Sequence, residues 1–239
     1  MASSNIAAQN NPLGPVVKGP TSPFPQAKLL DGVTIRIERL SPSHADDLYS
    51  MFGGSENAHL WDYMLSEHFT DRSAFQKYVS QRVQLSDPYD LAIIDKTSGK
   101  AVGCASYYNI RPDHRVIEVG FVMFSPLLQR TKAATEAMYL MARHAFEDLG
   151  YRRYEWKCND LNEKSKRAAL RLGFSFEGVF RQHMIIKGRN RDTAWFAMMD
   201  SEWPAAKEAF EKWLDPANFD ESGNQKVGLV AFRNPINKS

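Results

Sequence analysis

A helix start that follows an apolar strand could bind an anion. The segment Leu127–Glu136 has the small residues Ala133 and Ala134 in its first turn, and the cations Arg130 and Lys132 lie beside them. The first N–H groups of a helix have no helical partner, and the positive end of the helix dipole lies at the same place. Phosphate oxygens bind at such positions. The segment therefore predicts a phosphate site, although small residues that only serve helix packing would give the same pattern.

One carboxylate lies within the strand that leads to this helix. Alternation along Val116–Phe124 places Glu118 on the same strand face as Gly120 and Val122. Apolar surroundings disfavour the charged form of a carboxylate and raise its pKa toward neutrality, which suits a general base. Glu118 could instead lie at the exposed mouth of the strand or form an ion pair with an arginine, so both interpretations stay open.

A second helix start lies further along the chain. The segment Asn159–Phe174 opens a helix at Asn162 and closes it at Gly173. Together, the two helix starts resemble the GNAT superfamily of acetyl-CoA-dependent N-acetyltransferases. The Asn-x-x-Ser start and the Gly-Phe-x-x-Glu-Gly ending are similar to its ribosomal-protein N-terminal acetyltransferase branch. The resemblance extends from about Val33 to Leu214.

The resemblance implies that the first helix start holds the pyrophosphate of acetyl-CoA. The superfamily pattern there is Gln or Arg, two residues, Gly, one residue, and Gly or Ala. Gln129 and Ala134 fit this pattern, whereas Lys132 occupies a Gly position and can still give its backbone N–H if its φ is negative. Asn162 is implied to bond the pantetheine chain, with helix capping as the alternative. The implied cofactor-binding residues are Val122, Met123, Phe124, Gln129, Arg130, Thr131, Lys132, Ala133, Ala134, Asn162 and Ser165.

The resemblance also implies roles in proton transfer. Glu118 lies eleven residues before the Gln of the helix start, as the base does in the histone-acetyltransferase branch. Ala169 replaces the tyrosine that many members use as the acid, so Ser165 is implied to protonate the coenzyme thiolate; helix capping would also explain Ser165. Where the ribosomal-protein branch has a second catalytic Glu, this chain has Met184. The neighbouring His183 would point to the opposite strand face unless a bulge turned it.

An aromatic cluster before the second helix could form a wall of the amine pocket. Trp61, Tyr63 and His183 are the predicted substrate residues, and Asp62 would attract an ammonium group. Packing of the aromatic rings in the core is an equally good interpretation of the cluster.

These residues require a sheet that is covered by helices on both faces. Alternation and turn residues predict strands over 33–39, 91–95, 101–110, 116–124, 153–158, 174–187 and 193–199. Helical periodicity predicts helices over 44–52, 73–85, 131–149, 162–172 and 203–214. The expected fold is α/β and GNAT-type, with a mixed, mostly antiparallel central sheet of about seven strands that splays at the cofactor strand. Residues 188–192 are predicted as a turn in which Asp192 pairs with Arg189 or Arg191.

Composition indicates one globular domain with tails. The chain has 239 residues, 43% of them hydrophobic, and a formal net charge of +2, which is too small to favour a nucleic-acid or anionic-membrane surface. We expect a flexible arm over 1–26, a GNAT acetyltransferase domain over 27–214 and a C-terminal extension over 215–239. Cys104 and Cys158 offer neither a disulfide framework nor metal-ligand spacing, so no metal is expected. The chain has no signal peptide pattern and no apolar run long enough to span a bilayer, so a cytoplasmic location is expected.

The expected function is acetyl transfer from acetyl-CoA to a primary amine by direct attack. A small amine or an amino-acid-like molecule is favoured as the acceptor, because cations dominate the helix faces and no extended peptide groove is evident. Two alternatives stay open: a protein N-terminal acetyltransferase of the ribosomal type, and a non-catalytic acyl-CoA sensor. The sensor is motivated by Lys132, Ala169 and Met184, which depart from the family pattern. The expected partners are acetyl-CoA and the amine, without nucleic acid or membrane, and exposed apolar strands are compatible with a homodimer.

Overall fold

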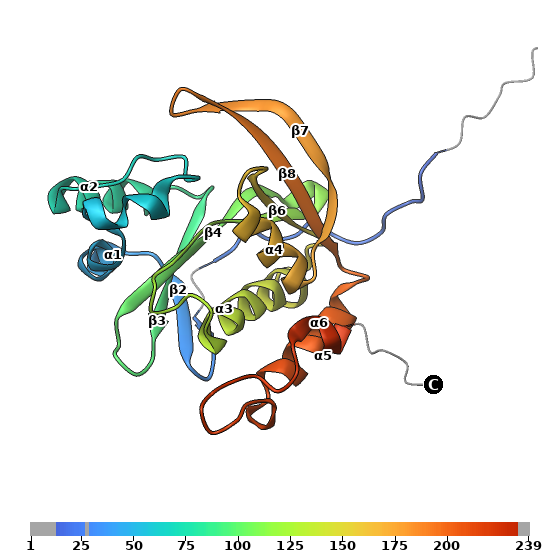
Figure 1. The fold of residues 1–239 in the computed structure, drawn as a ribbon. Coiled ribbons are helices and arrows are strands. Elements are labelled where there is room, and N and C mark those ends of the chain that lie inside the picture. Colours follow the sequence, from blue (N-terminus) through green and yellow to red (C-terminus); the bar gives the residue numbers. More distant parts are fainter. Residues whose placement is uncertain (1–12, 27–28, 234–239) are drawn as a thin grey trace, which may run out of the picture.

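The computed structural model describes residues 13–26 and 29–233, and its centre is one eight-stranded sheet in the order β1-β2-β3-β4-β5-β6-β8-β7 (Figure 1). Every neighbouring pair of strands is antiparallel except β5 and β6, which are parallel. The strands are β1 (Leu30–Asp31), β2 (Ile35–Arg39), β3 (Tyr89–Asp95), β4 (Ala101–Arg111), β5 (Val116–Phe124), β6 (Arg153–Asn159), β7 (Ser175–Ile186) and β8 (Arg189–Met199). The predicted α/β class and mixed sheet are confirmed, and the two-residue β1 is the strand that the sequence did not indicate.

Helices cover both faces of this sheet. They are α1 (Ala45–Phe52), α2 (Arg72–Arg82), α3 (Lys132–Arg143), α4 (Glu163–Leu172), α5 (Trp203–Leu214) and α6 (Leu229–Arg233), and a turn of π-helix at His144–Asp148 continues α3. Strand β3 is buried on both sides, so its alternate residues enter two cores. Leu91 and Ile93 join the core under α3, α4 and α5, whereas Ala92 and Ile94 join the core under α1 and α2.

The sheet opens between β5 and β6. These strands pair only over Val116–Val119, opposite Arg153–Trp156, and beyond Val119 strand β5 pairs with β4 alone. A bulge interrupts the β4–β5 ladder there, and Phe121 lies in it with a φ of 49°. A non-glycine residue in this left-handed region costs about 1–2 kcal/mol, so packing around Phe121 must hold the bend. The predicted splay at this strand is thus present.

Strands β7 and β8 form a long hairpin that reaches toward the segment between α1 and α2 (Figure 1). The prediction of a five-residue turn over 188–192 was wrong. Lys187 and Gly188 both have positive φ, at 51° and 69°, as a two-residue hairpin turn requires, so β8 begins at Arg189. The predicted pairing of Asp192 with a neighbouring arginine was also wrong, because its carboxylate accepts from the Gln182 N–H at 2.7 Å and from Asn190 Nδ2 at 2.9 Å.

Segments near both ends of the chain contact the domain, whereas Leu13 and Val16 at the start of the described chain are exposed. Residues 1–12 of the predicted arm and 234–239 of the predicted extension lie outside the described residues. Ser22 Oγ donates to the Gly150 carbonyl at 3.0 Å, and Tyr151 donates to the Pro23 carbonyl at 3.1 Å, so this part of the arm is docked. Helix α6 contacts α4 and α5. Within the described ranges, each helix lacks either the length or the apolar character that a membrane span requires.

Candidate functional site

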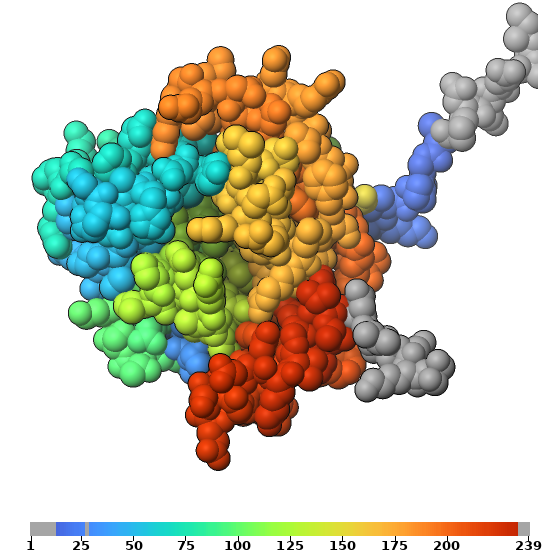
Figure 2. Space-filling model, viewed as in Figure 1, coloured from blue at the N-terminus to red at the C-terminus, as the bar shows by residue number. Residues whose placement is uncertain are grey.

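A cleft of about 1890 Å³ begins where β5 and β6 separate. Figure 2 shows a hollow between α4, the start of α3 and the segment that joins α1 to α2. Because the sheet is open here, residues from both of its faces line one cleft. Its α3–α4 half is lined by Gln129, Arg130, Thr131, Lys132, Ala134, Asn162, Lys164, Ser165, Arg167 and Arg171. Its β7–β8 half is lined by Glu118, Lys157, His183, Met184, Arg191, Thr193 and Trp195.

The α3–α4 half contains the predicted helix start. Thr131 is the N-cap of α3, and its hydroxyl accepts from the Ala134 N–H at 3.1 Å. The N–H groups of Lys132 and Ala133 lie in the first turn of α3, where no helical carbonyl can accept from them. They are therefore available to a ligand. Lys132 is the first residue of α3 and its φ is negative. A lysine can therefore replace the glycine of the family pattern without backbone strain. Gln129 shapes the preceding turn, because its Nε2 donates to the Phe124 carbonyl at 2.7 Å.

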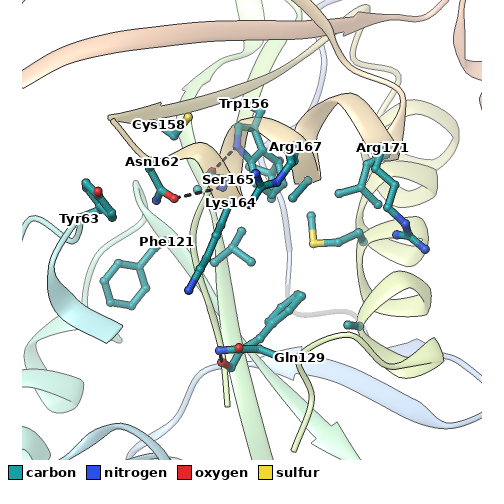
Figure 3. A pocket seen from close by; sticks show the side chains of 18 of the residues that line it. Tyr63, Phe121, Gln129, Trp156, Cys158, Asn162, Lys164, Ser165, Arg167 and Arg171 are labelled. Carbon is teal, nitrogen blue, oxygen red and sulfur yellow. Dashed lines mark hydrogen bonds between the residues drawn. The ribbon is translucent and has the colours of Figure 1, made fainter. Parts of the chain in front are cut away.

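Cations surround this helix start. Figure 3 shows Lys164 and Arg167 extending from α4, with Lys164 directed across the cleft toward Gln129. Arg171 donates to Thr135 Oγ1 at 3.1 Å and lies 5.0 Å from the Trp213 ring centroid. Sequence reasoning named Arg130 and Lys132 but missed the cations of α4, although their spacing of three and four residues places them along one helix face.

The C-terminal segment also lines the α3–α4 half. Trp213, Phe219 and Gln225 reach the cleft, and Lys132 Nζ lies 4.5 Å from the Phe219 ring centroid. Trp213 Nε1 donates to Gln225 Oε1 at 2.7 Å, which ties the end of α5 to the extension. This contribution was not predictable from the sequence, because the segment is polar and carries none of the family motifs.

Asn162 and Ser165 lie together at the start of α4 (Figure 3). Asn162 caps the helix by accepting from the Ser165 N–H at 3.1 Å, as the capping interpretation requires. Ser165 Oγ accepts from Trp156 Nε1 at 3.0 Å. Burial raises the pKa of the Cys158 thiol, and a hydrogen bond donated by the Ser165 hydroxyl offsets part of that increase. The capping of α4 uses the Ser165 backbone N–H and not its hydroxyl, which lines the cleft and bonds Trp156; its proposed acid role stays a prediction.

Glu118 lies in the β7–β8 half and is 7% exposed. Burial raises its pKa above the ordinary value, whereas the charge and hydrogen bond of Lys157 and the hydrogen bond of Asn109 lower it. Both donors bind the same oxygen, Oε2, Lys157 Nζ at 2.9 Å and Asn109 Nδ2 at 2.5 Å. A Cβ on Gly120 would lie 3.5 Å from the other oxygen, Oε1, so a larger residue at this position would contact that oxygen. The carboxylate is therefore buried and paired, with a lysine rather than an arginine.

Lys157 belongs to a larger network of charges. Its Nζ also lies 3.0 Å from Glu155 Oε2 and 3.8 Å from the Trp195 ring centroid. Burial acts to raise the pKa of Glu155, but Arg153, Lys157 and Arg111 lower it overall. Parallel pairing aligns Glu118 with Glu155, which brings the network beneath the cleft. Sequence reasoning missed Lys157, since only the register of β5 against β6 brings it to Glu118.

The three predicted substrate residues have different environments. Trp61 is 1% exposed and does not line the cleft; its Nε1 donates to the Phe52 carbonyl at 2.8 Å, and its ring contacts Phe121. The structure thus corrects its predicted position in the pocket, because the buried carbonyl satisfies the indole in the core. Tyr63 does line the cleft, and its hydroxyl donates to the Leu161 carbonyl at 3.2 Å.

His183 lines the cleft because β7 contains a bulge. The β7–β8 register shifts between Phe180 and Met184, and Gln182 has a φ of 50°. His183 Nδ1 lies 3.0 Å from Thr193 Oγ1, and Met184 also reaches the cleft. The condition set by the sequence, a bulge that turns His183, is met.

Two of the remaining predicted residues do not line the cleft with their side chains. Met123 is 4% exposed and packs in the core under α1 and α2, while Ala133 packs against the core under α3. Their backbone groups still belong to the free edge of β5 and to the start of α3. Among the described residues, no cluster of three or more His, Cys, Asp or Glu side chains could hold a metal ion. Cys104 and Cys158 are buried and are not joined in a disulfide.

Comparison with known proteins identifies relatives of this arrangement. The family described as Acetyltransferase (GNAT) domain matches residues 34–175. A GCN5-related N-acetyltransferase structure from Brucella melitensis is 43% identical, covers 90% of this chain and 98% of its own, and has a TM-score of 0.88. A provisionally assigned GNAT-family acetyltransferase from Chromobacterium violaceum is 36% identical, covers 81% of this chain and 98% of its own, and has a TM-score of 0.75.

Curated relatives match over shorter stretches. YdaF of Bacillus subtilis, provisionally named a ribosomal N-acetyltransferase, is 27% identical over 109 residues, which are 46% of this chain and 59% of YdaF. The chain spans between half and three fifths of the length of the curated relatives it matches. The solved structures and the family match together agree with the predicted GNAT-type fold.

Proposed function

Because the chain belongs to the GNAT acetyltransferase family, we propose that it transfers the acetyl group of acetyl-CoA to a primary amine. The observation that carries this proposal is a helix start, open to an anion, at the point where the sheet separates. Acetyl-CoA has phosphate groups at one end and a thioester at the other, joined by a narrow arm with amide groups. The cations in one half of the cleft match the phosphates, and the buried carboxylate in the other half can act on an amine placed beside the thioester.

The cations and helix start of the α3–α4 half would hold the phosphates. The N–H groups of Lys132 and Ala133 can donate to pyrophosphate oxygens, and Arg130, Lys164 and Arg167 supply charge around them. The amides of the arm would pair with the free edge of β5 over Gly120–Phe124, where backbone groups have no β6 partner. Asn162, beside this edge, can bond the arm with its amide nitrogen while its oxygen caps α4.

Glu118 is proposed as the base for the amine. An amine attacks a thioester only as the free base, and α-amines have a pKa of about 8 whereas lysine side chains have one near about 10.4. Glu118 Oε1 can accept the proton, because Lys157 and Asn109 occupy only Oε2. The amine nitrogen forms a bond to the acetyl carbon, the carbon–sulfur bond breaks, and the electron pair leaves with the sulfur.

Ser165 is proposed to give its hydroxyl proton to the departing thiolate and to take a proton from water in the cleft in its place. Its oxygen accepts from Trp156 Nε1, so rotation of the hydroxyl away from Cys158 would direct the proton into the cleft. A thiol of pKa about 8.5 is a reasonable leaving group, so this step adds less to the rate than removal of the amine proton. Positioning of amine and thioester supplies the rest.

A small or amino-acid-like amine is the proposed acceptor, since contacts bridge the cleft on the side of the β7–β8 half. Lys187 at the hairpin turn donates to the Trp61 carbonyl at 2.8 Å, and Figure 2 shows the hairpin meeting the segment between α1 and α2. Tyr63 and Leu161 form a second bridge. An extended polypeptide would have to displace these contacts, whereas a small molecule would not.

Two other functions are kept as outcomes of the test. A protein N-terminal acetyltransferase is favoured by the name of YdaF and by the Asn-x-x-Ser start of α4. A non-catalytic acyl-CoA sensor is favoured by Lys132 at a glycine position, which leaves the helix start intact.

Release of free thiol from acetyl-CoA tests the proposal. The panel contains free amino acids, small amines and short peptides. Glu118→Gln and Ser165→Ala are measured beside the unmodified chain, and Glu208→Gln on the exposed face of α5 is the matched control. We expect turnover with a small amine, a large loss in Glu118→Gln and a smaller loss in Ser165→Ala. Turnover with peptides alone supports the N-terminal acetyltransferase. Tight binding of acetyl-CoA without turnover on any acceptor supports the sensor.

A further inference from the structure

Arg191 is a half-buried cation of the β7–β8 half that forms no ion pair with any Asp or Glu of residues 13–26 and 29–233. It extends from β8 into the cleft, and its Nε donates to Thr193 Oγ1 at 3.2 Å. Thr193 is 1% exposed and also holds His183. The Arg191 side chain is therefore fixed at its Nε, while its two terminal nitrogens remain available as donors.

Two other largely buried cations near β5 have carboxylate partners. Lys157 pairs with Glu118 and Glu155, and Arg82 pairs with Asp90. The carboxylate next to Arg191 in sequence, Asp192, is bound to the bulge of β7 instead. Removing a guanidinium from water without an anion is unfavourable, and burial accordingly lowers the pKa of Arg191. A bound anion would relieve this cost.

We propose that Arg191 binds the carboxylate of the acceptor, so that the acceptor is a free amino acid. This inference rests on the proposed function and narrows its acceptor class. A guanidinium binds a carboxylate through two parallel N–H···O bonds, and the terminal nitrogens of Arg191 can provide them. Glu118 would face the amine of the same molecule, because Glu118 and Arg191 line one half of the cleft and interact electrostatically. The negative charge of Glu118 would face the ammonium group of a zwitterionic amino acid, and the positive charge of Arg191 would face its carboxylate.

Matched acceptors separate this inference from a general preference for amines. Kinetics of the full-length chain at saturating acetyl-CoA compare free L-amino acids with the corresponding amino acid amides. Removal of the carboxylate charge also lowers the pKa of the α-amine, so each kcat/KM and KM is referred to the concentration of the free-base amine. The variants are Arg191→Gln, Arg191→Lys and the control Arg189→Gln, which lies on the same hairpin but outside the cleft lining. Thermal melting and acetyl-CoA affinity check that each variant is folded.

The unmodified chain should use an amino acid with a higher kcat/KM than its amide. Arg191→Gln should raise KM for the amino acid about tenfold or more and change KM for the amide by less than about twofold, because a charge-assisted bidentate contact is lost only for the acid. Arg191→Lys should lie between them, and Arg189→Gln should match the unmodified chain. If Arg191→Gln does not fold, the Lys variant and the acid-to-amide ratio of the unmodified chain still decide the question.

Three results would overturn the inference. The first is an equal preference for acids and amides in the unmodified chain, and the second is an equal loss on both in Arg191→Gln. The third is Arg191-dependent transfer to a peptide amide that begins with Asp but not to free amino acids. In that case, Arg191 would bind the side-chain carboxylate of a peptide. Thiol release that fails with every amine would instead contradict the proposed function itself.

Discussion

In the α3–α4 half of the cleft, the cations have no carboxylate partners within the described part of the chain, whereas the β7–β8 half contains charges that are mostly paired. Arg130, Lys164 and Arg167 line the first half around a helix start. In the second half, Glu118 is bound by Lys157 and Asn109 before any ligand arrives. The difference indicates that the first half is completed by the charge of its ligand, while the second half is already organised for chemistry. Mutations in the first half should therefore lower acetyl-CoA affinity, and mutations in the second half should lower kcat.

Glu118→Gln should have the largest effect. The amide cannot accept the amine proton, so we expect kcat to fall about 10²-fold or more. Acetyl-CoA affinity should remain within about twofold of the unmodified chain, because the phosphates bind in the other half. Steady-state kinetics and calorimetric titration with acetyl-CoA measure the two parameters. A normal kcat would remove Glu118 from the mechanism.

Ala133→Glu should break the α3–α4 half alone. A carboxylate in the first turn of α3 is favourable for the helix dipole but repels a bound phosphate, so acetyl-CoA affinity should fall about tenfold, or about 1.4 kcal/mol. Because Ala133 is half-buried against the core, thermal melting checks that the variant is folded. Ala205→Glu makes the same change in the first turn of α5, outside the cleft lining, and serves as the control. An unchanged affinity of Ala133→Glu for acetyl-CoA would show that the phosphates do not bind at the start of α3.

Lys157→Met should sharpen the account of Glu118. Lys157 lowers the pKa of Glu118, which burial raises, so removal of the cation should raise that pKa further. The base works only in its ionised form above its pKa, and the acid limb of the kcat/KM profile should therefore move to higher pH. The acceptor amine titrates identically in both enzymes, so the displacement isolates the enzyme group. Lys212→Met on the exposed face of α5 is the control. An acid limb that stays fixed in Lys157→Met would show that Lys157 does not set the pKa of the catalytic base.

Thr131→Val should have the smallest effect and should act on stability. The substitution removes the hydroxyl that caps Ala134, at a cost of about 1 kcal/mol in the free energy of unfolding. Without the hydroxyl, the Ala134 N–H becomes one more donor for a phosphate. Acetyl-CoA affinity should therefore not fall by more than about twofold. Urea denaturation and calorimetry report the two quantities, with Thr97→Val in an exposed turn as the control. A large loss of affinity at unchanged stability would show that the hydroxyl itself binds the ligand.

The α3–α4 half was largely predictable because its signals are local in the chain. Small residues after a strand predicted the start of α3, and the predicted bounds of β5 and α5 agree with the structure. Capping by Asn162 also follows from residues that are neighbours in sequence. Each of these features depends on periodicity or on contacts within a few residues, which a sequence displays directly.

The β7–β8 half was harder to predict because it depends on pairing between distant strands. Lys157 reaches Glu118 only through the register of β5 against β6. Asn109 reaches Glu118 because it lies in a bulge of β4, where its φ is 46°. His183 depends on a bulge of the same kind. Trp61 was placed in the pocket because an aromatic cluster looks the same in a core and in a cleft. Register and bulges are set by the whole sheet, and no local pattern specifies them.

Kinetics with varied acetyl-CoA on Ala133→Glu and Glu118→Gln, measured side by side, test the central claim that the two halves have separate roles. Ala133→Glu should raise KM for acetyl-CoA while kcat is kept, and Glu118→Gln should lower kcat while KM for acetyl-CoA is kept. Loss of the same parameter in both variants, or no thiol release by the unmodified chain with any amine, would contradict it.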